Sequence, residues 1–221
     1  MQKITRTVVV GVLLLTGVLS LLSIQWKITP EKNLENSDIE IPATGGDFSS
    51  LEPMIAFIKL VFNGERNTIR GVYSPGVMSY PVIQQPPGNP ALVSEEPDIV
   101  TQFQLADTYN VIGLLAHNYL AGDSFFKLQI GDSVWVIYGD GSARRYEVVA
   151  IKEYYVKEPY NVYSQFIDLD SGLELSVNEM FMHVYSGDHH LTLQVSVSQG
   201  NDEAWGRRFI IAEPRESQTG R

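Results

Sequence analysis

The chain has 221 residues, of which 44% are hydrophobic, 10% aromatic and 19% charged, and it contains no cysteine. Without a thiol it has no disulfide framework, no cysteine-ligated metal site and no cysteine nucleophile. Its apolar content is too high for a disordered protein, and its charged content is too high for a polytopic membrane protein. We therefore expect one globular domain with its own core.

The charges are unevenly distributed along the chain. Residues 1–27 contain only three charged side chains, Lys3, Arg6 and Lys27, so the remainder carries 13 basic and 26 acidic side chains. A nucleic-acid partner requires a basic surface to bind its phosphates. We therefore expect no nucleic acid among the partners of this chain.

Positions 8–24 form an uncharged apolar run, flanked by the basic residues Arg6 and Lys27. The run approaches the roughly 20 residues that cross a bilayer as a helix. It exceeds the roughly 7–15 apolar residues of a signal peptide, and no small-residue cleavage site follows it. We expect residues 1–27 to be a signal anchor, a single transmembrane helix in the cell membrane, with the rest of the chain extracytoplasmic. A cleaved signal peptide is the alternative.

Residues 28–50 have few large apolar side chains and many turn formers, which predicts a flexible tether to an outer domain over residues 51–221. The first predicted element of that domain covers 51–62, where the apolar pattern favours a short helix and a strand is the alternative. The stretch 82–100 contains four prolines and is predicted to be mostly loop.

Six later segments are rich in β-branched and aromatic residues and are bounded by glycine, aspartate or proline, as is typical of strands. They cover residues 68–73, 108–117, 132–140, 143–156, 190–197 and 207–213. Between the third and fourth segments, residues 139–142 read GDGS and predict a tight hairpin turn, because glycine readily adopts the positive φ that such turns need.

One late helix is predicted over residues 177–185, where Ser176 and Glu179 form an S-x-x-E capping box ahead of an apolar stripe. Many short strands with one or two short helices favour a mainly β fold. A closed or nearly closed β-barrel fits this pattern, because closure leaves no strand edge unpaired.

Three pieces of the sequence, in their order, carry a family resemblance. Residues 110–118 read NVIGLLAHN, a predicted strand that ends at a histidine. Residues 125–149 read FFKLQIGDSVWVIYGDGSARRYEVV, and residues 190–211 read HLTLQVSVSQGNDEAWGRRFII. Over about residues 68–213 the chain resembles the sortases, the membrane-anchored cysteine transpeptidases of bacterial surfaces. The resemblance implies a sortase-like barrel that binds a sorting-type peptide of a surface protein.

The resemblance also implies which residues form the site. His117 matches the catalytic histidine of the family, and Arg208 matches its catalytic arginine, with Arg207 as the neighbouring alternative. Thr192 matches the start of the family's T-L-x-T-C strand and is expected, with Arg208, to contact the substrate. Ser196 stands where the catalytic cysteine belongs.

A serine at this position changes the chemistry. A cysteine attacks as a thiolate, whereas a serine must pass its proton to a well-oriented base during attack. The nearest carboxylates in sequence, Asp107, Asp188 and Asp202, have no spacing that assigns one of them to orient that base. We therefore expect a catalytically impaired protein that keeps a groove for LPxTG-type peptides. The alternatives are an active hydrolase or transpeptidase with Ser196 as nucleophile and a purely structural barrel.

The predicted tether contains a sequence that differs from LPxTG only by isoleucine for leucine. It consists of Ile41, Pro42, Ala43, Thr44 and Gly45. A sorting signal ordinarily precedes an apolar span, whereas this one follows it. Two interpretations stay open: an extended exit from the membrane, or a segment recognised by the chain's own groove or by a neighbouring sortase.

Three histidines, His183, His189 and His190, invite a metal-site interpretation. Adjacent residues on a strand place their side chains on opposite faces, and no zinc or calcium ligand pattern accompanies these histidines. The chain also contains no nucleotide-binding or other hydrolase motif. We therefore expect no metal and no cofactor.

Overall fold

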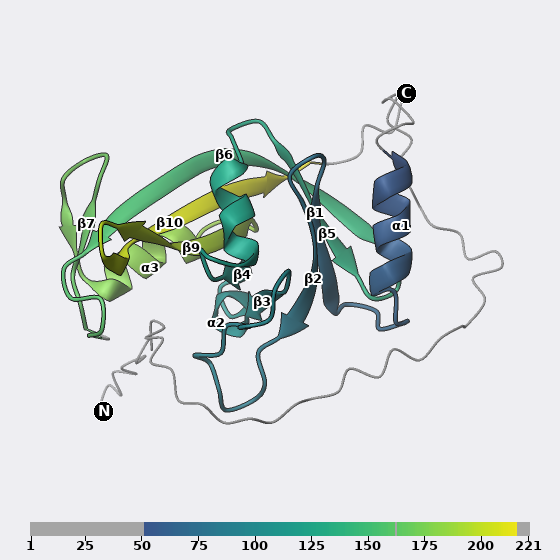
Figure 1. The fold of residues 1–221 in the computed structure, drawn as a ribbon, viewed down its shortest axis with the longest axis horizontal. Coiled ribbons are helices and arrows are strands. Elements are labelled where there is room, and N and C mark those ends of the chain that lie inside the picture. Colours follow the sequence, from purple (N-terminus) through teal and green to yellow (C-terminus); the bar gives the residue numbers. More distant parts are fainter. Residues whose placement is uncertain (1–50, 162, 216–221) are drawn as a thin grey trace, which may run out of the picture.

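The computed structural model describes residues 51–161 and 163–215. Within these residues the chain forms ten strands, three α-helices and a 3-10 helix (Figure 1). The elements in chain order are α1 (Leu51–Val61), β1 (Ile69–Ser74), β2 (Met78–Gln84), β3 (Val100–Phe103), α2 (Gln104–Asp107), β4 (Ile112–Ala116), η2 (Ala121–Lys127), β5 (Ser133–Tyr138), β6 (Ala143–Val156), β7 (Phe166–Asp168), β8 (Glu174–Leu175), α3 (Val177–Tyr185), β9 (Leu191–Gln199) and β10 (Asp202–Pro214).

Eight of the strands form a closed ring. Their order is β10, β9, β4, β3, β2, β1, β5 and β6, and β6 pairs again with β10 to complete the ring. The pairs β2–β3 and β4–β9 are parallel, and the other pairs in the ring are antiparallel. β7 and β8 continue from β6 beyond the ring, at the end of the molecule away from α1 (Figure 1). The expected closed β-barrel is therefore confirmed as a mixed, eight-stranded one.

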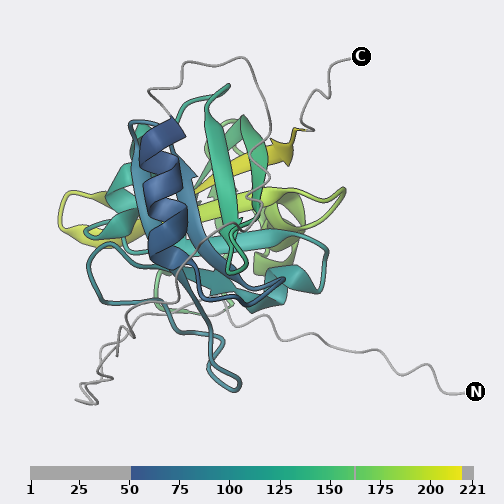
Figure 2. The ribbon, with the colours of Figure 1, turned by 90° about the vertical axis from the view of Figure 1, so that its right-hand side faces the viewer.

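The two faces of the barrel strands carry different hydrophobic clusters. The inner cluster fills the barrel and includes Leu191, Leu193 and Val195 of β9. The outer cluster lies between the sheet and α3 and includes Phe209 of β10 and Leu115 of β4. Because side chains alternate along a strand, every odd residue of β9 from 191 to 195 faces the interior. A third cluster packs α1 against β1 and β5 (Figure 2).

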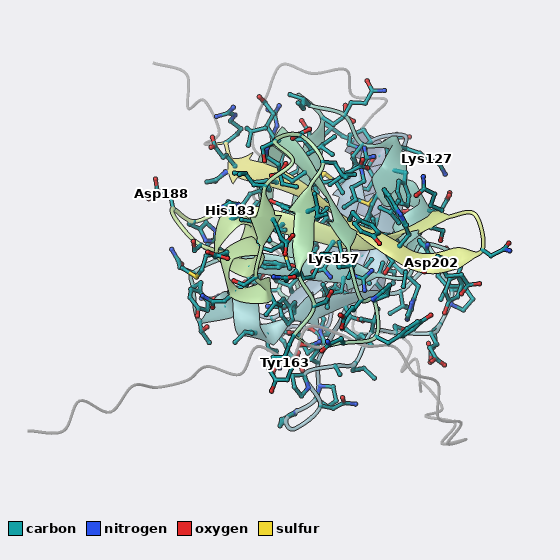
Figure 3. The ribbon with its side chains drawn as sticks, turned by 90° about the vertical axis from the view of Figure 1, so that its left-hand side faces the viewer. Lys127, Lys157, Tyr163, His183, Asp188 and Asp202 are labelled. Carbon is teal, nitrogen blue, oxygen red and sulfur yellow. The ribbon has the colours of Figure 1, made fainter. Side chains whose placement is uncertain are left out.

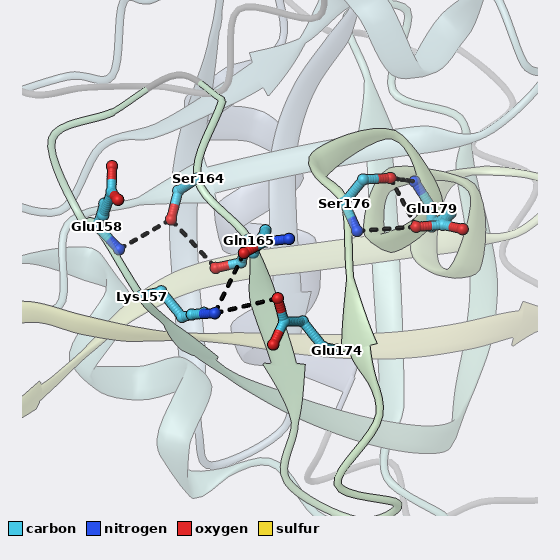
Figure 4. Close-up of polar contacts among 7 residues, drawn as sticks. All are labelled: Lys157, Glu158, Ser164, Gln165, Glu174, Ser176 and Glu179. Atoms are coloured by element: carbon cyan, nitrogen blue, oxygen red, sulfur yellow. Dashed lines mark hydrogen bonds and ion pairs between the residues drawn. The ribbon is translucent and has the colours of Figure 1, made fainter.

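The predicted helix over 177–185 is confirmed as α3, and its capping box is formed. Ser176 N donates to Glu179 Oε2 at 2.8 Å, and Glu179 N donates to Ser176 Oγ at 3.3 Å (Figure 4). These two bonds satisfy backbone donors that a helix start otherwise leaves unpaired. In the same view Lys157 Nζ lies 3.0 Å from Glu174 Oε1, an ion pair that ties the end of β6 to β8.

Three other predictions also match the structure. The strand over 143–156 has the bounds of β6, and the helix over 51–62 is α1 with one residue fewer. The predicted hairpin turn joins β5 to β6, with Tyr138 N donating to Ser142 O at 2.8 Å and Gly141 at a φ of 85°.

The prediction of one strand over 108–117 is wrong in its first half. The helix α2 ends at Asp107, a turn follows, and β4 begins only at Ile112. Asn110 has a φ of 60° in that turn, which reverses the chain before the strand. The predicted loop over 82–100 also begins too early, because β2 continues to Gln84.

The signal anchor predicted at 1–27 and the tether predicted at 28–50 lie outside the described residues. Among the residues described, no helix has both the length and the apolar character needed to cross a bilayer. The membrane anchor, the domain boundaries and the extracytoplasmic location therefore stay predictions.

Candidate functional site

The parallel pairing of β4 with β9 brings two of the predicted site residues together. Ala116 at the end of β4 lies opposite Val195 of β9, so the next residues along the two strands are His117 and Ser196. Residues that follow the same register of a parallel pair lie at the same edge of the sheet. His117 and Ser196 are 79 positions apart in sequence and line one pocket.

This first pocket is small. It has a volume of about 20 Å³, which is close to the space of one water molecule. Its lining combines apolar side chains with one histidine, one glutamine, one serine and one arginine. The lining residues are Val93, Leu115, Ala116, His117, Gln194, Val195, Ser196 and Arg207.

His117 lies buried at the pocket with one ring nitrogen unpaired. Its residue surface is 6% exposed, and Nε2 has no hydrogen-bond partner among the described residues. Burial lowers the pKa of His117 below its ordinary value, while the carboxylate of Glu95 and the backbone of Val93 act in the opposite direction. The ring is therefore neutral at pH 7. The ring of Tyr119 packs against it at a tilt of 31°, with the ring centroids 5.1 Å apart.

The arginine at the pocket is Arg207. It lies opposite Ser196 in the antiparallel pair of β9 and β10, so both side chains leave the same face of the sheet. Arg207 Nη1 donates to the carbonyl oxygens of Ala204 at 3.1 Å and Gly206 at 2.7 Å. Burial lowers the pKa of Arg207 to about 10, which leaves the guanidinium charged at neutral pH.

Arg208, the predicted catalytic arginine, lies opposite Val195 and therefore on the other face. Its Nη1 lies 2.9 Å from Glu153 Oε1, and its guanidinium lies 5.4 Å from the centroid of the Phe126 ring. The structure thus brings His117 and Ser196 together with Arg207 and does not bring Arg208 into their pocket. The register of β10 shifts between Asp202 and Gly206, so counting residues from the turn does not reveal which arginine faces the serine.

Thr192, the residue predicted to contact a substrate together with Arg208, lies inside the structure. Thr192 is fully buried, and its Oγ1 donates to the carbonyl oxygen of Val184 at 2.7 Å. Val184 lies in the last turn of α3, where backbone carbonyls lack partners within the helix. Thr192 therefore attaches the end of α3 to β9.

None of the three aspartates considered from the sequence contacts His117. Asp107 accepts two hydrogen bonds from Gln102 Nε2, and Asp202 Oδ1 accepts one from Ala204 N. The carbonyl oxygen of Asp188 accepts one from a histidine at position 190. Nε2 of His117 has no partner among the described residues, so Ser196 does not donate a hydrogen bond to this nitrogen, which is the contact that would let the histidine act on the serine through Nε2.

Two of the three histidines that suggested a metal site form hydrogen bonds of another kind. His189 bonds to the hydroxyl of Tyr146 and to the carbonyl of Asn110, and both ring nitrogens of His190 contact backbone carbonyls. His183 and Asp188 lie on the side of the molecule opposite Asp202 (Figure 3). Within the part of the chain that the structure describes, no three ligand-type side chains form a group that could hold a metal ion.

A second pocket, which the sequence did not reveal, lies beside the first. It has a volume of about 430 Å³ and is lined by Asn118, Tyr119, Ser198 and Glu203. Tyr119 lies between the two pockets, because it lines this one and its ring packs against His117, which lines the first. The lining comes from the segment after β4, the end of β9 and the start of β10, which no local motif links.

No protein-family model and no curated protein matches the chain. Solved structures of sortases are similar to it at low identity. Sortase A from Corynebacterium diphtheriae is 12% identical with a TM-score of 0.47, over 71% of this chain and 65% of that one. Sortase C-1 from Actinomyces oris is 14% identical with a TM-score of 0.47, over 83% and 91% of the two chains. Sortase A from Listeria monocytogenes is 12% identical with a TM-score of 0.43, over 68% and 89%.

The chain thus spans somewhat less than two thirds of the C. diphtheriae sortase A. All three of these solved proteins are sortases. The likeness concerns the fold alone, and the present chain has no cysteine.

Proposed function

We propose that the chain is a membrane-anchored, sortase-like protein of the cell surface that binds an extended peptide and does not catalyse its transfer. One observation supports this proposal above the others. His117, Ser196 and Arg207 line a single pocket, yet the serine replaces a thiol and the histidine Nε2 has no partner. The pocket therefore has groups that recognise a peptide and lacks the contacts that activate a nucleophile.

Arg207 supplies the attraction for a peptide. Its guanidinium is charged, and both hydrogen bonds that the described residues give it start from Nη1. An arginine has five N–H donors, so further donors remain for a peptide carbonyl or carboxylate. His117 Nε2 adds a neutral group that either donates or accepts, depending on its tautomer.

The size of the pocket limits what enters it. A volume of about 20 Å³ accepts a single small group, such as a carbonyl oxygen or a methyl group. The rest of the peptide would lie outside the pocket in an extended conformation. An alanine or glycine next to the recognised carbonyl fits this arrangement better than a large side chain.

The chain itself contains one candidate peptide, the segment 41–45 with the sequence IPATG. It lies outside the described residues. A tether of this length gives a millimolar effective concentration wherever it spans the distance to the pocket. Peptides of the same type from other surface proteins would then compete with the chain's own segment.

The second candidate function is a serine hydrolase or transpeptidase. The neutral state of His117 and its position beside Ser196 favour it, because a general base must be unprotonated and close to the nucleophile. It requires a movement that joins Ser196 Oγ to Nε2. A purely structural barrel is the third, and it predicts neither peptide binding nor turnover.

The variant Ser196→Cys tests the proposal directly on the full chain. We expect the introduced thiol to be alkylated slowly at pH 7, at the rate of an ordinary thiol, because His117 Nε2 forms no hydrogen bond with position 196 among the described residues. If alkylation is slow and an IPATG peptide suppresses it, the pocket binds the peptide without activating the thiol at position 196. Rapid alkylation together with cleavage of LPxTG-type peptides would show that the catalytic arrangement is intact.

A further inference from the structure

The second pocket is built from segments that hydrogen bonds hold together. Asn118 Nδ2 donates to Ser198 Oγ at 2.6 Å, which joins the segment after β4 to the end of β9. Ser198 Oγ donates to the carbonyl oxygen of Glu203 at 3.3 Å, which joins β9 to β10. The lining is therefore tied across three elements and presents a fixed set of polar groups.

An aromatic ring forms part of this pocket. Tyr119 is 66% exposed, although its ring also packs against His117, with the centroids 5.1 Å apart and the rings tilted by 31°. A large apolar ring that remains this exposed offers a flat contact surface for a ligand. The contact with a buried histidine holds the ring in place, so little side-chain entropy would be lost when a ligand contacts the ring.

The charges that act on Tyr119 are negative. Burial raises the pKa of its hydroxyl, and the carboxylates of Glu95 and Glu203 raise that pKa further. Neither glutamate takes part in an ion pair between described residues. The pocket thus combines an exposed ring, an unpaired carboxylate at its lining and a second carboxylate close enough to act on the same hydroxyl.

A guanidinium group fits this combination. It stacks on an aromatic face and pairs with a carboxylate through two parallel N–H donors. Oδ1 of Asn118 is a further acceptor, because its amide nitrogen is the atom that donates to Ser198. The volume of about 430 Å³ exceeds what one long side chain occupies.

We propose that the pocket of Asn118, Tyr119, Ser198 and Glu203 binds an arginine side chain of the peptide partner. The arginine stacks on Tyr119 and pairs with Glu203. This inference rests on the proposed function, because it assigns the specificity of the same peptide site. The two pockets then present opposite charges to the peptide, since Arg207 attracts a peptide oxygen and Glu203 attracts a basic side chain.

A small probe tests the pocket separately from peptide recognition. The full chain in detergent micelles is titrated with N-acetyl-arginine amide and with the neutral isostere N-acetyl-citrulline amide, and the NMR signals of the Tyr119 ring are followed. We expect the arginine probe to bind about tenfold more tightly. Equal binding of citrulline, or equal binding of N-acetyl-lysine amide, would overturn the guanidinium assignment.

Matched variants identify the groups responsible. Glu203→Gln keeps the shape of the side chain and removes its charge, so the preference for arginine over citrulline should fall to about twofold or less. Tyr119→Leu should weaken arginine binding, whereas Tyr119→Phe keeps the ring and serves as the control. A preference that survives both Glu203→Gln and Tyr119→Leu would contradict the proposal.

A pair of peptides separates this inference from the proposed function. Both contain IPATG, and one carries an added arginine where the other carries citrulline. If both peptides bind equally well and Arg207→Ala abolishes their binding, this inference is overturned and the proposed function stays intact. Binding of the arginine probe without binding of either peptide overturns the proposed function and retains the cation pocket.

Discussion

The two faces of the β9–β10 hairpin carry different kinds of residues at almost the same positions in sequence. The inner face presents Val195 and Arg208 to the barrel, and the outer face presents Ser196 and Arg207 to the pocket. Arg208 is held by an ion pair with Glu153, whereas Arg207 is held by two backbone carbonyls. The two neighbouring arginines therefore have different surroundings, and the proposed function assigns peptide recognition to Arg207 and a structural role to Arg208.

The largest difference between the faces should appear in stability. Leu193 is fully buried in the barrel interior, so Leu193→Ala should lower the free energy of unfolding by about 2–5 kcal/mol. Ser196→Ala on the outer face should change it by about 0.5 kcal/mol or less. Chemical denaturation of both variants measures the contrast. Equal losses would mean that the two faces are not as different as the structure describes.

The two arginines should differ in peptide binding. Arg207→Met removes charged donors from the pocket and should weaken binding of an IPATG peptide by about 10- to 100-fold. Arg208→Met, the matched control, should leave binding unchanged and reduce stability by about 1 kcal/mol or less, because its ion pair with Glu153 is partly exposed. Titration calorimetry and denaturation separate the two effects. The reverse pattern would return the recognition role to Arg208.

Thr192→Val tests whether the predicted substrate contact is a structural one. The change removes the hydrogen bond to the Val184 carbonyl while preserving shape, so stability should fall by about 1 kcal/mol. His190 Nε2 still contacts that carbonyl at 3.2 Å, which keeps the loss small. Peptide affinity should be unaffected. A fall in affinity without a fall in stability would indicate a binding role for Thr192.

The burial of His117 should make the free energy of unfolding depend modestly on pH. The pKa of His117 is lowered in the folded state from its ordinary value of about 6.5. At pH values below about 6.5 the unfolded chain therefore binds more protons than the folded chain. The stability contributed by the neutral ring is fully present above pH 6.5 and is lost as pH falls through the lower, folded-state pKa. The variant His117→Asn should lack this loss when unfolding is measured between pH 7.5 and 5. If the free energy of unfolding changes with pH in the same way in both proteins, the pKa of His117 is not lowered.

Much of the barrel was predictable because its signals are local. The hairpin turn at 139–142, the capping box at Ser176 and the β-branched run of β6 each depend on residues close in sequence. β2 contains Pro81 and β7 and β8 have three and two residues, so their patterns were too short or too irregular to identify.

The site was predictable only in part. His117 and Ser196 were identified through the resemblance to sortases, and the β4–β9 register places them together. The choice between Arg207 and Arg208 depends on a shift in strand register, which the sequence does not display. The pocket around Tyr119 joins three separate segments, and only the folded chain brings them together.

Binding and cleavage of one LPxTG-type peptide, measured on the same sample of the full chain, distinguish a peptide-binding protein from an enzyme. We predict saturable binding that Arg207→Met weakens, with no cleavage over the time in which a cysteine-containing sortase would turn over the peptide. Cleavage that disappears in Ser196→Ala would contradict it and would establish Ser196 as a nucleophile.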